Sequence, residues 1–366
     1  MNETQSCHAV SLNEKNFILA FKQKLRHRQL PARLPPPTLQ AHPPCPPEAR
    51  RQGPSPPMRM LDTADTAARL PWPALRGALE AIFRDGCAAP LRHAHPLPQN
   101  DAAEGTLLLM PAWQPHRYTG VKIVHVTPAN ARQPGLQAVH SVYLLSHGET
   151  GQPLCLLDGG TLTDRRTAAA SVLAATYLAR PDSHRLLLLG SGKVAHALAE
   201  AYAERFPLSE LRIWSRRAES AARLAATLAA TGLPARAVAE ADPRGADIVA
   251  AATLSTAPLF DGALVEPGTH VDLVGSFRRD MRESDATLVR RARLFVDTRA
   301  GALAEAGDVV QAIAEGAIDE GHIQADLFAL CRGEHCGRQD AGEITLFKSV
   351  GWAGEDLAAA VLAYEN

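Results

Sequence analysis

The segment that most constrains the fold is a run of four leucines that leads at once into a glycine-rich turn. Residues 186–189 have the apolar character of a buried strand, and Gly190, Gly192 and Ala195 then follow in a G-x-G-x-x-A pattern where a helix begins. Gly190 permits the tight turn, Gly192 lets a pyrophosphate approach the backbone, and Ala195 lets the helix pack on the strand. The helix N-terminus adds N–H donors and partial positive charge. We therefore predict a dinucleotide-binding turn whose cofactor contacts come from Gly190, Ser191, Gly192, Lys193 and Val194.

Short apolar segments separated by helix-forming sequence continue beyond this turn. The segments expected to form strands are 186–189, 211–214, 235–238, 247–252, 270–274 and 294–296. Regular alternation of strands and helices indicates a doubly wound parallel sheet, because right-handed crossovers place helices on both of its faces. The predicted fold class is α/β, and residues 181–310 are assigned to a Rossmann dinucleotide-binding domain.

The end of the second predicted strand carries residues that select between dinucleotides. An NAD-selective site usually offers an acidic residue about 20 positions after the turn, where it holds the ribose hydroxyls. This chain has Ser215, Arg216 and Arg217 there, and guanidinium groups suit a 2′-phosphate, although arginines at a strand end are commonly plain surface charges. The pattern favours NADPH over NADH as the cofactor. Thr253, after the fourth predicted strand of this region, is expected on the nicotinamide side.

The region before the leucine run has a different rhythm and predicts a second, α+β domain. Trp72, Leu75, Leu79 and Phe83 recur at helical spacing and indicate an amphipathic helix that ends near Gly86. The other expected elements are strands at 106–110 and 121–126, a hairpin of 142–145 with 154–157, and a helix at 167–179. An antiparallel or mixed sheet follows from this order.

The C-terminal segment is expected to complete that second domain. Beyond Gly307 the chain reads as helical, and a helix over residues 356–364 should pack back on the first half. The second domain is therefore assigned to residues 58–180 together with residues 311–366.

The first 57 residues have the composition of a flexible extension. Eleven of the 27 prolines lie between residues 31 and 57, with almost no periodic apolar residues among them, so this segment cannot build a core. Met58 and Met60 precede the first orderly pattern, which makes them candidates for the natural start of translation.

Composition narrows the classes of partner. Lys plus Arg (38) nearly balance Asp plus Glu (39), so no global field attracts nucleic acid or a membrane surface, and we expect a small-molecule substrate. Six scattered cysteines fit reduced thiols, and Cys331, His335 and Cys336 lack the second pair of a metal site, so no metal is predicted. No apolar run approaches the roughly 20 residues of a membrane span, and residues 1–10 do not resemble a signal peptide. We expect a cytoplasmic protein.

Three cations outside the glycine-rich turn are candidates for substrate binding. Lys122 interrupts the strand-like run Val-Lys-Ile-Val, where a buried lysine needs a partner or a task, although a lysine on an exposed sheet edge is the alternative. Arg92 follows a Pro-Leu pair, and Arg166 stands near the start of a long helix; either fits an ordinary surface arginine as well. Together they would bind a carboxylate, which arginine holds bidentately.

Several motifs resemble the ornithine cyclodeaminase/μ-crystallin family over nearly the whole chain from Met58. In order, they are GTLLLMPAW, GVKIV, LLDGGTLTDRRTAAAS, GSGKVA, VGSFRRDMRE and ITLFKSVGWAGEDLAAA. The resemblance implies a homodimer in which the domain built from both chain ends binds substrate and forms the dimer. It also implies that Arg92, Lys122 and Arg166 contact substrate, and that Lys348, Ser349 and Val350 lie near the nicotinamide. Ser349 is accordingly a cofactor-binding candidate.

The family contains several chemistries, and one position separates them. Ornithine cyclodeaminases carry an aspartate shortly after the glycine of the VGSF segment, whereas this chain has Phe277, which can neither take nor give a proton. The resemblance therefore favours reduction of Δ1-pyrroline-2-carboxylate to L-proline by NADPH or NADH. Reduction of Δ1-piperideine-2-carboxylate to L-pipecolate is a second expected activity. In this reading Arg92 and Arg166 fix the carboxylate and Lys122 acts as general acid.

Three rival hypotheses stay open at the level of sequence. The first is ornithine cyclodeaminase, which forms L-proline and ammonia from L-ornithine. The second is an amino-acid dehydrogenase that acts on open-chain 2-oxo acids with ammonia or an amine. The third is a crystallin-like protein that binds the dinucleotide and a small ligand without turnover.

Overall fold

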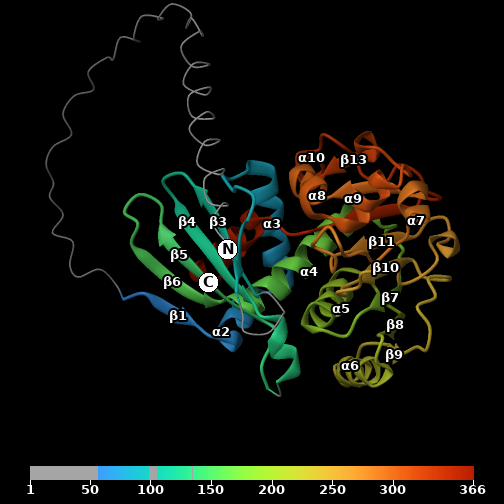
Figure 1. The fold of residues 1–366 in the computed structure, drawn as a ribbon, viewed down its shortest axis with the longest axis horizontal. Helices are drawn as coiled ribbons and strands as arrows, with labels where there is room; N and C mark the ends of the chain where they lie inside the picture. Colours follow the sequence, from blue (N-terminus) through green and yellow to red (C-terminus); the bar gives the residue numbers. More distant parts are fainter. Residues whose placement is uncertain (1–56, 99–104, 134) are drawn as a thin grey trace, which may run out of the picture. The chain divides into compact units, whose positions relative to one another are not determined.

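The computed structural model describes residues 57–98, 105–133 and 135–366, and its strands form two sheets (Figure 1). The predicted extension over residues 1–57 lies outside the described residues except for its last position. One sheet has six strands in the order β1-β6-β5-β4-β3-β2, and the other has eight in the order β13-β12-β14-β11-β10-β7-β8-β9. Within the described ranges, no helix is long and apolar enough to cross a membrane.

The six-stranded sheet comes from the N-terminal half. Its strands are β1 (Arg59–Leu61), β2 (His93–Leu97), β3 (Gly105–Gln114), β4 (Tyr118–Val126), β5 (Val139–His147) and β6 (Pro153–Asp158). All neighbours pair antiparallel except β1 and β6, which are parallel. The predicted hairpin is confirmed, since Tyr143 pairs with Leu157 and Leu144 with Leu156. Strands β1 and β2 were not predicted, because three residues and a His-Ala-His-Pro run carry little strand signal.

Four helices accompany this sheet. They are α2 (Thr63–Ala68), α3 (Trp72–Asp85), α4 (Gly159–Leu178) and α11 (Ala353–Glu365). The predicted helix α3 buries Leu75, Leu79 and Phe83 and ends at Gly86, whose φ of 80° suits glycine. Helix α4 begins eight residues before the predicted start, because the Asp158 carboxylate accepts a hydrogen bond from the Thr161 amide and caps it. Helix α11 packs against α3, β3 and β4, as expected of the C-terminal segment.

The eight-stranded sheet is parallel throughout and confirms the predicted α/β class. Its strands are β7 (Arg185–Leu189), β8 (Glu210–Trp214), β9 (Ala235–Ala237), β10 (Ile248–Ala251), β11 (His270–Leu273), β12 (Arg293–Val296), β13 (Ile323–Asp326) and β14 (Thr345–Lys348). The connecting helices include α5 (Lys193–Arg205), α6 (Ala218–Ala230), α7 (Ala286–Arg291), α8 (Arg299–Glu305), α9 (Gly307–Ala314) and α10 (Leu327–Cys331). Leu186 and Leu188 enter one hydrophobic core while Leu187 and Leu189 enter another, so this strand is buried on both faces.

The segment after Gly307 departs from the expectation that it is helical. Strands β13 and β14 both lie in it, and β14 pairs with β11 on one side and β12 on the other. Short buried strands lack the alternation that reveals a half-exposed strand, which is why they were missed. The sheet thus extends past residue 310, where the sequence analysis ended the Rossmann domain; the division of the chain into domains stays a prediction.

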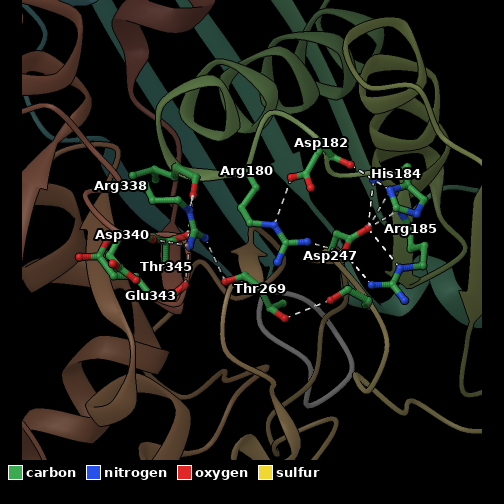
Figure 2. A network of polar contacts seen from close by, with 12 residues as sticks. Arg180, Asp182, His184, Arg185, Asp247, Thr269, Arg338, Asp340, Glu343 and Thr345 are labelled. Atoms are coloured by element: carbon green, nitrogen blue, oxygen red, sulfur yellow. Dashed lines mark hydrogen bonds and ion pairs between the residues drawn. The ribbon is translucent and has the colours of Figure 1, made fainter.

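Polar contacts around the buried Asp247 tie together the amino ends of the central strands (Figure 2). Asp247, just before β10, accepts hydrogen bonds from Arg180, from the His184 amide, and from the amide and guanidinium of Arg185. Burial alone would raise the pKa of Asp247, but the bonds from Arg185 and the two amides hold it at about 2. Nearby, Arg338 donates to Thr345 Oγ1 at the start of β14. At this edge of the sheet, Asp247 forms ion pairs with both Arg180 and Arg185.

Candidate active site

A cavity of about 340 Å³ lies between the six-stranded sheet and loops at the carboxyl ends of the eight-stranded sheet. Its walls come from β3, β4, β5 and α4, from the start of α5, and from the loops that follow β10, β11 and β14. In an open parallel sheet the carboxyl ends of the strands form the crevice where ligands bind. The predicted site residues that line this cavity are Arg92, Lys122, Arg166, Lys193, Val194, Thr253 and Ser349.

Lys122 is the buried cation of the cavity. Strand β4 lies between β3 and β5, so the alternative of an exposed edge lysine is excluded, and the residue is only 2 % exposed. Its Nζ donates to Asp356 Oδ1 over 2.8 Å. Burial is the largest influence on the Lys122 pKa, and with Arg166 and Arg92 it lowers that pKa to about 8, although the Asp356 carboxylate opposes the shift. The ammonium can therefore lose or give its proton near neutral pH.

Arg166 joins the same cluster from helix α4. Its Nη1 donates to Glu355 Oε2 over 2.7 Å and its Nε donates to Asp356 Oδ1 over 2.9 Å. Glu355 and Asp356 are fully buried in the first turn of α11, and burial raises the pKa of Glu355 to about 7. We call Lys122, Arg166, Glu355 and Asp356 the cavity cluster. Sequence reasoning missed both acids, whose signal was a pair of carboxylates in an otherwise small and apolar helix, GEDLAAA.

Arg92 approaches the cavity from the loop before β2. Its Nη2 donates to the carbonyls of Val350 and Gly351 over 2.7 and 3.0 Å, and its Nε lies 3.0 Å from Glu305 Oε2. Each predicted substrate-binding cation thus has a carboxylate partner, and the sequence analysis named none of these three carboxylates. One nitrogen of each arginine is still available, because Arg92 Nη1 and Arg166 Nη2 make no hydrogen bond to any residue that the structure describes.

The glycine-rich turn has the geometry that its sequence predicts. Gly190 has a φ of 125°, and a Cβ there would lie 2.6 Å from the Ala252 carbonyl oxygen. Gly192 precedes α5, and a Cβ there would meet no atom within 4 Å. Ala195 is fully buried, so the helix packs closely on the sheet. Open space before a helix N-terminus fits a pyrophosphate, which supports the assignment of Gly190, Ser191 and Gly192 to a cofactor.

The end of β8 lies beside this turn. Ser191 Oγ donates to Ser215 Oγ over 2.9 Å, which fixes the two loops against each other. Arg216 and Arg217 follow, both exposed, and neither forms an ion pair with a described residue. They lie outside the cavity lining. This placement fits contact with the adenosine half of a dinucleotide, and a preference for a 2′-phosphate stays a prediction.

The loop after β14 is held by one buried carboxylate. Asp297 Oδ2 accepts hydrogen bonds from Ser349 Oγ and from the amides of Val350 and Gly351, over 3.1, 2.9 and 2.7 Å. Ser349 and Val350 line the cavity, while the side chain of Lys348 is fully buried behind them. Phe277, in the loop after β11, also lines the cavity and brings no ionisable group to it.

Comparisons with known proteins agree with one another. The sequence profile of the ornithine cyclodeaminase/mu-crystallin family matches residues 71–366. A Δ1-pyrroline-2-carboxylate reductase of Paracoccus denitrificans is 38% identical over 314 residues, which cover 82% of this chain and 95% of that protein. The ketimine reductase mu-crystallin of Mus musculus is 35% identical over 284 residues, which cover 77% and 86%.

A solved structure extends the similarity to three dimensions. Δ1-pyrroline-2-carboxylate reductase of Thermococcus litoralis, determined in complex with NADH and L-proline, has a TM-score of 0.79 and 34% sequence identity to this chain. The match covers 84% of this chain and 97% of that one.

Proposed function

Because this chain belongs to the ornithine cyclodeaminase/μ-crystallin family, as its motifs predicted, we propose that it is an NAD(P)H-dependent reductase of cyclic ketimine acids. The proposed reaction converts Δ1-pyrroline-2-carboxylate to L-proline, with Δ1-piperideine-2-carboxylate to L-pipecolate as a second activity. The observation that carries the proposal is a buried lysine of lowered pKa, placed in one cavity with two arginines, each of which has one nitrogen that bonds to no described residue.

The arginines account for binding of the substrate carboxylate. Arg166 Nη2 and Arg92 Nη1 are the guanidinium nitrogens without a partner among the described residues, and both side chains line the cavity. Their other nitrogens are fixed by Glu355, Asp356, Glu305 and two carbonyls, so neither guanidinium has to be ordered when substrate binds. Such preorganised donors orient a carboxylate and hold the imine carbon in one place.

Lys122 accounts for the proton that the reaction needs. When bound, the dinucleotide supplies a hydride to the carbon of the C=N bond. The nitrogen must gain a proton, and Lys122, with a pKa of about 8, is protonated at neutral pH yet able to give its proton up. Asp356 keeps the ammonium oriented through its 2.8 Å hydrogen bond. The conjugate amine regains its proton from solvent between turnovers.

The remaining wall of the cavity suits the methylene groups of a small ring. Leu108, Met110 and Val124 project into it from β3 and β4, and Val126 and Val139 extend the same apolar surface. Phe277 adds an aromatic side chain from the opposite loop. A side chain that can neither take nor give a proton disfavours ornithine cyclodeaminase, in which this position handles protons of the substrate amine.

The outer face of the six-stranded sheet supports the proposed homodimer. Leu107, Leu109, Val121, Ile123, Val142, Leu144 and Met60 alternate with the inward residues of their strands. None of them belongs to a hydrophobic core of the described residues, and Met60 and Val142 are exposed. A continuous apolar sheet face requires a cover, and a second copy of the chain would provide it. Light scattering on the purified protein tests this assembly.

A substrate panel tests the proposed activity. Purified protein is incubated with NADPH or NADH and one of the two cyclic imines, or with pyruvate plus ammonia or methylamine. L-ornithine with NAD⁺ forms the last arm, in which released ammonia is measured. We expect oxidation of the cofactor that depends on the cyclic imine, with no ammonia from ornithine. Ornithine-dependent ammonia, a preference for the open-chain acid, or the absence of any turnover would each overturn the proposal in favour of one rival.

A further inference from the structure

One buried carboxylate bonds two of the loops that line the cavity. Glu283 Oε1 accepts hydrogen bonds from the amide and the hydroxyl of Thr253, over 2.6 and 2.8 Å. Its Oε2 accepts from the amides of Gly275 and Ser276, over 2.8 and 3.3 Å. Thr253 follows β10, and Gly275 follows β11, so Glu283 holds the carboxyl ends of two adjacent central strands at a fixed separation.

The backbone around Glu283 is itself held by a second buried carboxylate, that of Asp308. Its amide donates to Asp308 Oδ1 over 2.7 Å, and the amide of Ser284 donates to the same oxygen. The second oxygen of Asp308 lies 3.4 Å from the Lys348 ammonium. Glu283, Asp308 and Lys348 are all fully buried. A buried carboxylate is costly unless hydrogen-bonded and balanced by charge, and this network supplies both.

These loops approach each other so closely that two of their contact points require glycine. A Cβ on Gly275 would overlap the backbone of Thr253 and the carboxylate of Glu283, and a Cβ on Gly307 would overlap the carbonyl oxygen of Met281. The loop from Gly275 to Glu283 is therefore closed at its ends by the Glu283 side chain, and it carries Phe277 into the cavity wall.

We propose that Glu283 is a positioning residue for the nicotinamide end of the dinucleotide, acting through Thr253 and Gly275 without touching the cofactor. The inference rests on the proposed function, since it presupposes that a nicotinamide dinucleotide occupies the crevice. Thr253 and Gly275 line the cavity whereas Glu283 does not. The glycine-rich turn lies after another strand, β7, and none of its residues bonds to Glu283. The adenosine half should therefore be independent of this carboxylate.

Glu283→Gln is the variant that tests whether Glu283 supports the nicotinamide end of the dinucleotide and not the adenosine half. All four groups that bond to Glu283 are donors, and glutamine offers a single acceptor oxygen, so its NH2 group would face the donors of one loop. The chain offers a matched control in Asp272→Asn. Asp272 is also fully buried, on β11, but it accepts from the hydroxyls of Ser171 and Tyr202, which can reorient to suit an amide.

The readout is direct binding, measured by fluorescence titration with NADH and NADPH and by calorimetry with ADP-ribose, which lacks the nicotinamide. For Glu283→Gln we expect the Kd for the intact dinucleotide to rise by about tenfold or more, as loss of charge-assisted bonds implies. The Kd for ADP-ribose should stay within about twofold, and Asp272→Asn should leave both values near those of the parent. A purely structural role for Glu283 would weaken both ligands alike.

The outcomes separate this inference from the proposed function. If the parent protein binds neither dinucleotide, the proposed function fails and the inference falls with it. If the parent binds them and Glu283→Gln binds equally well, or loses ADP-ribose in proportion, the inference alone is overturned. If Glu283→Gln does not yield folded protein, Asp308→Asn is tested instead. It weakens the hydrogen bonds that Asp308 accepts from the amides of Glu283 and Ser284, and so loosens the support of Glu283. A loss of about threefold for NADH, with ADP-ribose unchanged, supports the inference, and unchanged affinity for NADH overturns it.

Discussion

Two clusters of basic side chains and buried carboxylates lie in different regions of the molecule and differ in their charge balance. In the cavity cluster, Lys122 and Arg166 bond to Asp356, and Arg166 also bonds to Glu355. At the amino edge of the parallel sheet, Arg180 and Arg185 bond to Asp247, an arrangement that we call the amino-edge cluster (Figure 2).

The two clusters differ in how completely their charges are satisfied. Asp247 accepts five hydrogen bonds, its arginines are partly exposed, and its pKa is held at about 2. In the cavity cluster both members of each ion pair are buried. This burial moves the pKa values of Lys122 and Glu355 toward neutrality. Ion pairs alone therefore do not mark a functional site; unsatisfied donors beside a cavity, with displaced pKa values, do.

Replacement of Lys122 gives the largest effect that this comparison predicts. Lys122→Met keeps the volume of the side chain but removes the proton donor, so we expect kcat to fall by about 10²–10⁴, the range for loss of a general acid. Steady-state kinetics with the cyclic imine measures it. Binding of NADPH should be unchanged, and Arg185→Met in the amino-edge cluster, the control, should leave kcat unchanged. A normal kcat in Lys122→Met would remove this residue from the mechanism.

The pH dependence of the reaction reports the partnership between Lys122 and Asp356. A general acid must be protonated, so kcat/KM should decline as the pH rises through about 8, where Lys122 loses its proton. The Asp356 carboxylate raises the pKa of Lys122 by stabilising the ammonium. Asp356→Asn should therefore move the declining limb toward lower pH by about one pH unit or more, and lower kcat/KM at pH 9, above both pKa values, by about tenfold.

Rate profiles between pH 6 and 10 measure this shift. Asp247→Asn serves as the control, because it removes a carboxylate of the amino-edge cluster, and its profile should follow that of the parent. A limb that stays in place in Asp356→Asn would show that a group other than Lys122 controls the decline.

Arginines without a carboxylate partner extend the same comparison to the cofactor. Arg216 and Arg217 are exposed and form no ion pair with the described residues, so they remain available for a phosphate. Replacing both with alanine should raise the Kd for NADPH by about tenfold and change that for NADH less than twofold. Fluorescence titration measures both. Arg236→Ala, which removes an arginine already paired with Glu210, is the matched control, and equal losses for NADPH and NADH would refute phosphate selection.

Local features of the fold and site could be predicted from sequence, whereas long-range partners could not. The glycine-rich turn is visible because its function lies in consecutive backbone positions, from Gly190 to Ala195. The partnership of Lys122 with Asp356 joins residues 234 positions apart, and no periodicity encodes it. Sequence showed that Lys122 needed a partner but not which one, since many acids in the chain were candidates.

The missed strands have a related cause. Strand β14, Thr345–Lys348, is only four residues long and wholly buried between β11 and β12, so it lacks the polar alternation of a half-exposed strand. Its position in the sheet also depends on pairing with strands more than 40 residues away. Because β14 lies between β11 and β12, Ser349 at its end reaches the cavity. Only the family resemblance had implied this placement.

The smallest predicted effect concerns the amino-edge cluster, where a variant should change stability and leave turnover intact. The folded-state pKa of Asp247 lies at about 2, below its ordinary value of 3.8. A depressed carboxyl pKa gives stability that is present above about pH 4 and is lost as the pH falls through about 2. Asp247→Asn should therefore lower Tm at pH 7 by about 2–4 °C and reduce the dependence of Tm on pH between 2 and 4. Calorimetry measures both, with kcat as the second readout. A drop in kcat with unchanged Tm would reverse the assignment of stability to this cluster and catalysis to the other.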